Sequence, residues 1–297
     1  MAKKWEGKSR GNVLGYKIFV YILKTFGVRS AYFILYFVAF YFLLFSVKGS
    51  KASYYYFRKR LEYSVLKSIY NVYKTNFVFG QTILDKVAIP SGLKDKFTYE
   101  FDREYILKDM LKDKKGGILI SAHVGNFEIA EHFLNDIDVD SQFNLVTTDQ
   151  EHKAIKEFLE KVASKSNLKF IIVKEDMSHV FEMNRALSNN ELIVFTGDRF
   201  FEGTKTLKST LLGKEAEFPA GPFLLGSRLK VPVAYVYVMK ETATHYHSYT
   251  RLATFKNRNA QDLLDNYTKN IEWILSLYPT QWFNFFDFWN DMGSTKD

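Results

Sequence analysis

The sequence predicts an α/β protein with a mixed, mainly parallel sheet that is flanked by helices and preceded by an N-terminal helical segment. From residue 117 onward, short apolar runs typical of buried strands alternate with segments whose apolar residues recur at helical spacing. This alternation indicates parallel pairing, because parallel neighbours need a crossover helix on one face of the sheet. The second observation is an uncharged, aromatic-rich run at Ser30 to Val47, which is typical of an apolar helix.

The elements ahead of the sheet are expected to be mostly helical. They are helices within residues 1–80, including one around 54–73, then a Pro-Gly turn at 89–92 and a helix at 102–111. We therefore divide the chain into a basic, aromatic-rich helical segment at 1–80 and an α/β domain at 81–297.

The elements of the sheet region follow from residue periodicity. Two late strands are expected to pair antiparallel, and an amphipathic helix closes the chain. The predicted strands are 117–121, 143–148, 169–173, 191–196, 231–239 and 246–255, and the predicted helices are 127–134, 152–164, 178–188 and 261–277.

Composition excludes several classes of protein. The chain has 297 residues, of which 47% are hydrophobic and 17% aromatic, so it can bury a large core and is not intrinsically disordered. It contains no cysteine, which excludes disulfides, thiolate metal sites and a cysteine nucleophile.

Positive charge is concentrated at the N-terminus. Residues 1–60 hold 12 Lys and Arg against one acid, Glu6, although the net charge of the whole chain is only +8. The run at Ser30 to Val47 has about the ~18 to 20 residues that cross a bilayer core, and basic residues flank it on both sides. We expect membrane association, through either a spanning or a monotopic helix, since the symmetric flanks give no orientation. The alternative is a buried helix of a soluble bundle.

The segment Ser121 to Glu128 is the most informative part of the chain. His123 is expected at the end of a strand, Gly125 permits a tight turn, Asn126 is a plausible N-cap, and Glu128 falls in the first helical turn. A neutral imidazole accepts a proton at physiological pH, and a neighbouring carboxylate orients it. We expect Glu128 to fold back on His123 and form a proton-abstracting pair.

Asp198 and Arg199 also follow directly on a predicted strand. Sites of open α/β sheets lie beyond the carboxyl ends of the strands, so both this pair and His123 are expected to face one crevice. Arg199 would bind a phosphate or another anionic group, with Asp198 holding it in position. Gly221 lies in a Pro-Gly loop before a helix whose start could bind an anion. The alternatives are a surface ion pair at 198–199 and an ordinary turn at 221.

A metal site is not expected. Glu128, Glu131 and His132 lie within about one helical turn, but zinc helices need a second histidine at suitable spacing. His245 and His247 point to the same side of a predicted strand and lack carboxylates nearby, so surface or packing roles are favoured.

The pattern His123-x-Gly125-Asn126-aromatic-Glu128 resembles the His-x4-(Asp/Glu) block of the lysophospholipid acyltransferase superfamily, in particular its lipid A biosynthesis (late) acyltransferase branch. The resemblance extends over most of the chain, through segments at 197–199, 211–213, 221, 231–233 and 278–282. One departure is the acidic stretch at 149–151, where relatives carry basic residues that meet the acceptor's head group.

This resemblance implies an acyltransferase that moves a fatty acyl chain from an acyl carrier protein or coenzyme A thioester to a hydroxyl of a lipid acceptor. It implies catalysis by His123 and Glu128 and substrate binding by Asn126, Asp198, Arg199 and Gly221. Backbone amides near Asn126 and Phe127 would stabilise the oxyanion. The expected location is the bacterial inner membrane, with the catalytic domain on the cytoplasmic side. No metal, cofactor or nucleic acid is expected. A membrane-bound hydrolase and a non-catalytic lipid-binding protein remain alternatives.

Overall fold

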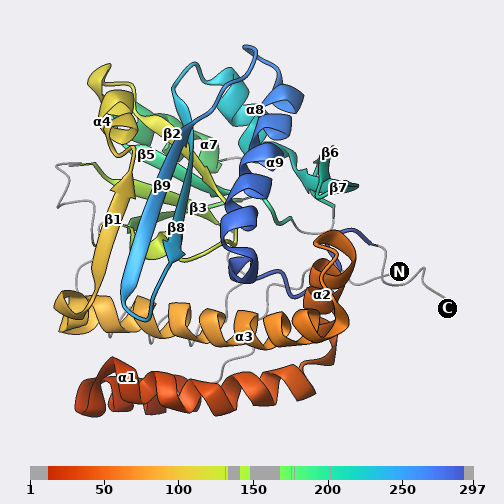
Figure 1. Ribbon diagram of the computed structural model, residues 1–297. Coiled ribbons are helices and arrows are strands. Elements are labelled where there is room, and N and C mark those ends of the chain that lie inside the picture. The colour runs from red at the N-terminus through yellow and green to blue at the C-terminus, as the bar shows by residue number, and fades with distance from the viewer. Residues whose placement is uncertain are drawn as a thin grey trace.

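A seven-stranded sheet lies at the centre of the part of the chain that the computed structural model describes, residues 13–130, 132, 141–147, 168–174, 176, 178–200 and 203–290 (Figure 1). Its strand order is β1-β9-β8-β2-β5-β3-β4, and every neighbouring pair is parallel except β8 and β9. The predicted fold class is therefore confirmed. The strands are β1 (Thr98–Asp102), β2 (Gly117–Ser121), β3 (Phe143–Thr147), β4 (Leu168–Ile172), β5 (Leu192–Thr196), β8 (Val233–Lys240) and β9 (His245–Leu252).

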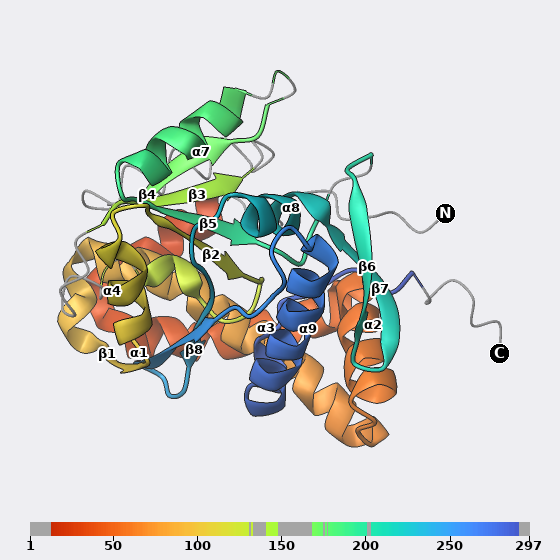
Figure 2. The same cartoon turned by 90° about the horizontal axis from the view of Figure 1, so that it is seen from above.

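Helices cover both faces of this sheet (Figure 2). On one face, α7 (Ser178–Ser188), α8 (Ala220–Arg228) and α9 (Ala260–Leu277) contribute to a core that includes Ile120 of β2. On the other, α4 (Tyr105–Lys112) packs with Leu119, the residue before Ile120 on the same strand. Because both faces are covered, every residue of β2 and β8 is buried, which explains their nearly continuous apolar sequences.

The N-terminal helices cross one end of the sheet (Figure 1). They are α1 (Val13–Phe45), α2 (Val47–Tyr55) and α3 (Val65–Ala88), and α1 packs along α3 with a change of direction at Gly27, whose φ is 79°. A shared core joins α1 and α3 to β8 and β9 through Val238 and Tyr246. The boundary expected between residues 80 and 81 falls inside α3, which runs continuously from Val65 to Ala88.

One predicted helix is interrupted, and three strands were not predicted. The helix predicted around 54–73 is interrupted, because the chain turns at Glu62, whose φ is 56°, and α3 restarts at Ser64, whose Oγ accepts from Lys67 N. Strand β1 and the hairpin of β6 (Thr206–Leu211) and β7 (Lys214–Pro219) were not predicted. They are half-exposed and rich in polar residues, so their apolar periodicity is weak.

Several short helical turns complete the described residues. The helix predicted at 127–134 begins as a single 3₁₀ turn, and most of its remainder, the helix predicted at 152–164 and the acidic stretch at 149–151 lie outside the described residues. The short turns are Tyr56–Arg60, Ile89–Leu93, Lys94–Lys96, Phe127–Ile129 and Pro279–Gln281.

Two leucines of α9 give a matched test of the core. Leu263 is fully buried, whereas Leu277 is 52% exposed. Leu263→Ala should lower the free energy of unfolding by about 2 to 5 kcal/mol, because it leaves a cavity. Leu277→Ala should change it by about 0.5 kcal/mol. Urea unfolding of the purified protein measures both values, and equal effects would show that α9 does not pack as described.

Candidate active site

His123 and Asp198 meet because their strands are neighbours in parallel register. Ser121 at the end of β2 pairs with Thr196 at the end of β5, and each functional residue follows two positions later. His123 Nδ1 lies 2.8 Å from Asp198 Oδ1, and both carboxylate oxygens accept from the backbone N–H of His123 at 3.1 Å. The carboxyl ends of the two strands thus bring the two residues together at one point.

Asp198 is ionised and almost fully buried, with 2% of its surface exposed. Burial alone would raise its pKa. The positive charge of the protonated His123 ring, the hydrogen bonds of His123 and the charge of Arg199 together lower the pKa to about 2. Trp282 Nε1 donates to its second oxygen at 3.3 Å. Asp198 is therefore a fixed negative charge that can only accept hydrogen bonds.

The imidazole of His123 is neutral at physiological pH. Burial and the nearby positive charge of Arg199 lower its pKa below the ordinary 6.5, and Asp198 and Glu128 offset part of this shift. Because the ionised carboxylate of Asp198 only accepts, the ring proton lies on Nδ1 and the lone pair on Nε2. The side chain is 28% exposed, so the ring is not sealed from solvent. This is the protonation state that a general base requires.

Glu128 does not occupy the position expected for it. Its carboxylate forms an ion pair with Lys86 of α3, with Oε1 2.8 Å from Nζ, and the orienting contact on His123 Nδ1 is made by Asp198. The expectation that Glu128 holds the imidazole is therefore corrected to Asp198. The physical reason is that neighbouring strands lie about 4.8 Å apart, so β5 places Asp198 beside His123, whereas Glu128 follows in a 3₁₀ turn beside α3. Glu128 still acts on His123 through its charge.

Asn126 braces the turn from inside the protein. Only 1% of its surface is exposed, and its Nδ2 donates to Thr82 O at 3.2 Å and to Tyr246 Oη at 3.4 Å. Its backbone N–H donates to Val238 O at 2.7 Å. The backbone amides near Asn126 and Phe127 were expected to stabilise an oxyanion. This is wrong for Asn126, whose amide is already bonded within the protein, and it stays a prediction for Phe127. An Asn126 side chain this deeply buried supports the turn rather than touching a substrate.

Gly125 has the conformation that the sequence predicted. Its φ is 64°, in the left-handed region that disfavours residues with a Cβ atom, and a Cβ there would lie 2.2 Å from Val238 O. Its N–H donates to Gln281 O at 2.9 Å. Both constraints bring the turn close against β8 and the C-terminal segment.

The C-terminal segment contributes residues that the sequence did not single out for chemistry. Val124 and Trp282 form an antiparallel bridge, and Phe283 N donates to His123 O at 2.9 Å. Trp282 also contacts Asp198, as noted above. The closing motif at 278–282 was noticed only as part of a family resemblance, and no residue type in it pointed to a catalytic site.

Arg199 remains a cation next to His123. Burial lowers its pKa to about 10, with Asp198 acting in the opposite direction, so it stays protonated at physiological pH. Its Nη2 donates to Phe283 O, and its guanidinium lies 5.8 Å from the ring centroid of Phe286. Asp198 was expected to hold Arg199, whereas its two oxygens bond His123 and Trp282. Arg199 can attract an anionic group of a substrate toward the imidazole.

Gly221 lies in the exposed first turn of α8. A Cβ atom at this position would meet open space, and the helix follows directly from the end of β7 at Pro219. No contact among the described residues indicates a role for Gly221, so its part in substrate binding stays a prediction.

His245 has carboxylates nearby, contrary to expectation. Glu100, Glu241 and His245 offer ligand atoms within 4.8 Å of one another, and Glu241 also lies 3.2 Å from His247 Nδ1. The expectation failed because β1, which carries Glu100 opposite His247, was not predicted. This spacing could hold a cation, but Glu100 is 69% exposed, and exposed acidic groups of this kind are common without a metal.

Comparison with known proteins identifies the family of the chain. A comparison with curated proteins gave no match. Residues 71–290, which include His123, Asp198 and the C-terminal segment that contacts them, match the family of bacterial lipid A biosynthesis acyltransferases. Because the match covers more than two thirds of the chain, the protein belongs to the bacterial lipid A biosynthesis acyltransferase family, within the lysophospholipid acyltransferase superfamily.

Proposed function

We propose that the protein transfers a fatty acyl chain from an acyl carrier protein or coenzyme A thioester to a hydroxyl of a lipid acceptor that resembles a lipid A precursor. Membership in the family supports an acyltransferase and implies an acyl donor and a lipid acceptor. The observation that carries the proposed mechanism is the 2.8 Å contact between His123 Nδ1 and a buried, ionised Asp198. This contact leaves Nε2 as the basic atom of a held imidazole.

In the proposed reaction, His123 Nε2 takes the proton of the acceptor hydroxyl as its oxygen attacks the thioester carbonyl. The new C–O bond forms, the C–S bond breaks, and the departing thiolate takes the proton from the imidazolium. Asp198 stabilises that imidazolium through its negative charge. No covalent acyl-enzyme is needed, because acceptor and donor react directly.

Two charged groups next to His123 are given supporting roles. Arg199 binds an anionic group of the donor or acceptor, since a guanidinium presents several donors to a phosphate. Glu128, paired with Lys86 at 2.8 Å, adds negative charge that favours the imidazolium. We therefore keep Glu128 in the proposed catalytic site as an electrostatic group, with Asp198 as the residue that orients His123.

We also propose that the protein is monotopic on the cytoplasmic side of the bacterial inner membrane. Over Lys17–Phe45, α1 is long and apolar enough to cross a bilayer, but one of its faces packs on α3. If α1 left this site to span the membrane, buried residues such as Leu23, Ala31 and Leu35 would lose their protein contacts.

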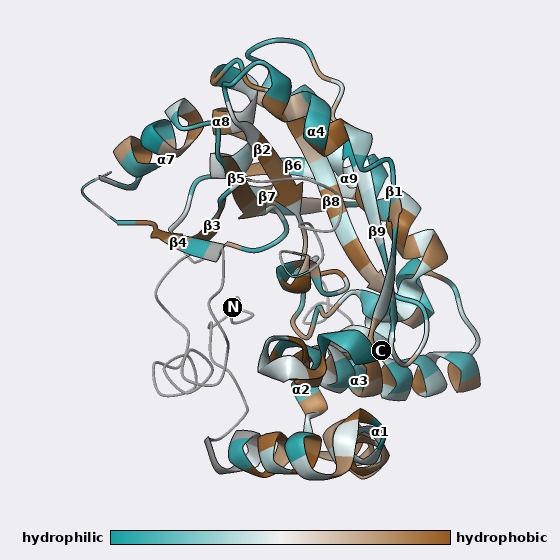
Figure 3. Cartoon of the chain, turned by 90° about the vertical axis from the view of Figure 1, so that its left-hand side faces the viewer, coloured by the Kyte–Doolittle hydropathy of each residue, from teal (hydrophilic) through white to brown (hydrophobic). Residues whose placement is uncertain are grey.

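Many aromatic and aliphatic side chains of α1 are exposed. Figure 3 shows hydrophobic segments, in brown, recurring along this helix. Basic residues lie at both ends of the helix, where they would meet anionic lipid head groups. A helix with this pattern fits the interface plane of one leaflet. The exposed apolar residues of α1 away from α3 are Ile18, Tyr21, Phe26, Phe33, Phe37, Phe40, Tyr41, Leu44 and Phe45, and α3 also exposes Val65, Leu66, Ile69 and Tyr70.

Replacing the proposed base tests the reaction. In detergent, with a thioester donor and a lipid A precursor, His123→Gln should lower kcat by about 100-fold or more, because general base catalysis contributes roughly that much. Asp198→Asn should lower kcat more than Glu128→Gln, because Asp198 bonds the ring whereas Glu128 is paired with Lys86. Near-normal turnover of His123→Gln would exclude it as the base. Equal release of free fatty acid without acceptor would indicate a hydrolase, and a larger effect of Glu128→Gln would reverse the two acidic roles.

The pH profile tests which group titrates. The base must be neutral, so kcat/KM should fall as the pH drops through the pKa of His123, which lies below 6.5. Arg199→Gln removes a positive charge and should shift this acidic limb to higher pH. Asp198→Asn removes a negative charge and should shift it to lower pH. Arg228→Gln, at the exposed end of α8, should leave it unchanged. Shifts of Arg199→Gln and Asp198→Asn in the same direction would show that another group limits the rate.

Topology can be read with single cysteines, because the natural chain has none. Lys17→Cys and Lys48→Cys place thiols near the two ends of α1, and Lys208→Cys marks the catalytic domain as a control. In spheroplasts, a membrane-impermeant maleimide should label none of the three, and lysis should expose all of them. Labelling of one α1 end but not the other before lysis would show that the helix spans the membrane.

A further inference from the structure

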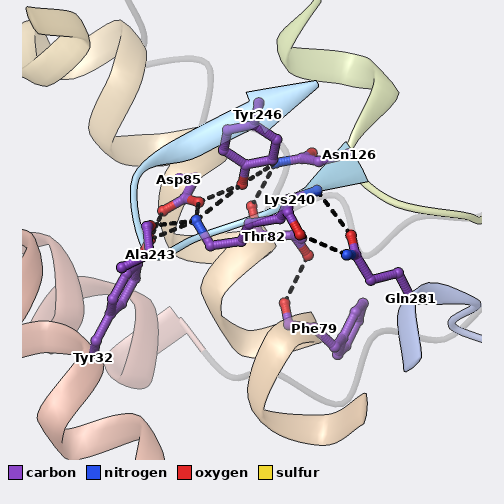
Figure 4. Close-up of polar contacts among 9 residues, drawn as sticks. All are labelled: Tyr32, Phe79, Thr82, Asp85, Asn126, Lys240, Ala243, Tyr246 and Gln281. Atoms are coloured by element: carbon purple, nitrogen blue, oxygen red, sulfur yellow. Dashed lines mark hydrogen bonds and ion pairs between the residues drawn. The ribbon is translucent and has the colours of Figure 1, made fainter. Parts of the chain in front are cut away.

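Asp85 and Lys240 form a buried ion pair next to the His123 turn (Figure 4). Lys240 Nζ lies 2.6 Å from Asp85 Oδ2, and the two side chains are 3% and 0% exposed. Two buried charges gain little net stability over well-packed apolar residues, and the loss of one partner is strongly destabilising. A pair of this kind therefore calls for a role beyond stability.

Two tyrosines extend the ion pair to further elements. Tyr32 of α1 donates to Asp85 Oδ1, and Tyr246 of β9 donates to Asp85 Oδ2. Lys240 Nζ also lies 3.1 Å from Tyr32 Oη and donates to Ala243 O. One carboxylate of α3 thus joins α1, β8 and β9, and we call Tyr32, Asp85, Lys240 and Tyr246 the Asp85 cluster (Figure 4).

The Asp85 cluster reaches the catalytic turn through Asn126. Asn126 Nδ2 donates to Tyr246 Oη at 3.4 Å and to Thr82 O at 3.2 Å, and Thr82 precedes Asp85 by less than one turn of α3. Asn126 lies three residues after His123. Its side chain therefore ties the turn to α3, which carries Asp85, and to β9, which carries Tyr246.

A second connection runs through Gln281. Its side chain bonds the main chain of Lys240 in both directions, with Oε1 accepting from Lys240 N at 2.9 Å and Nε2 donating to Lys240 O at 2.7 Å. Its own carbonyl accepts from Gly125 N at 2.9 Å. Gly125 and Asn126 are thus both anchored to residues of the Asp85 cluster or to their direct partners.

We propose that the Asp85 cluster is a positioning device for His123, and that Tyr32 makes the membrane-facing helix α1 a working part of the acyl-transfer site. Tyr32 lies on the inner side of α1, whose outer side carries the exposed aromatic residues. The packing of α1 on α3 then determines the geometry of the turn at 123–126. The kinetic part of this inference rests on the proposed function, because a misplacement of about ~1 Å at a reacting group can cost about 100-fold in rate.

Tyr32→Phe tests the link from α1, because it removes the hydroxyl and keeps the ring. We expect kcat to fall by about 10-fold or more, up to about 100-fold, with KM changed by less than about twofold. Backbone amides of the peptide 122–128 should exchange hydrogen faster, as seen by mass spectrometry. Tyr105→Phe, at an exposed tyrosine of α4 away from both α1 and the turn, is the control and should change neither value. Wild-type kcat and exchange in Tyr32→Phe would overturn the proposal.

The exchange measurement separates this inference from the proposed function. It reports the turn itself and needs no acyl donor or acceptor. If the wild-type protein transfers no acyl chain while Tyr32→Phe still loosens 122–128, the proposed function fails and the positioning role stands. If transfer is robust and both readouts ignore Tyr32→Phe, the positioning role fails alone.

A double variant separates positioning from stability. Asp85→Leu should destabilise the protein because the buried charge of Lys240 loses its carboxylate partner. Adding Lys240→Met removes that charge and should restore much of the unfolding temperature. We expect kcat of the double variant to stay at least about 10-fold low, because the turn has lost its anchor. Recovery of kcat together with stability would overturn the proposal. Asp102→Leu with Arg251→Met, which removes the ion pair between β1 and β9, is the control and should retain kcat. If the double variant does not fold, Tyr32→Phe decides the question.

Discussion

The hydrogen bond between His123 Nδ1 and Asp198 is the interaction on which the site depends. It exists because β2 and β5 are parallel neighbours in register, so that two residues beyond Ser121 and Thr196 the chains stand side by side. The bond fixes the tautomer of the ring, and the buried carboxylate can only accept. The strand order therefore determines which acidic side chain bonds the imidazole.

The turn that carries His123 is held in place by hydrogen bonds of its main chain. Its backbone N–H groups at Gly125 and Asn126 bond the C-terminal segment and β8, and the carbonyl of His123 accepts from Phe283. A turn fixed in this way holds the imidazole in place without relying on a substrate to order it. Through the Asp85 cluster, Tyr32 of helix α1, the helix proposed to meet the bilayer, is linked to Asn126 of the same turn.

Much of the fold could be predicted because burial imposes periodicity. Strands β2, β3, β4, β5 and β8 and helices α7 and α9 have apolar patterns that the sequence reveals. Edge strand β1 and the hairpin of β6 and β7 escaped prediction because half-exposed, polar strands lack that pattern. The missed β1 had a chemical consequence, since Glu100 lies beside two histidines that seemed to have no acidic neighbour.

The sequence by itself determined the class of fold, the family and the tight turn at Gly125. These features depend on residues close together in the chain. Only the tertiary structure decided which acid holds His123, because spacing along the chain pointed to Glu128 whereas the strand order delivered Asp198. It also decided that Asn126 faces inward and that Tyr32 joins the site, since such contacts arise from packing between segments that are far apart in sequence.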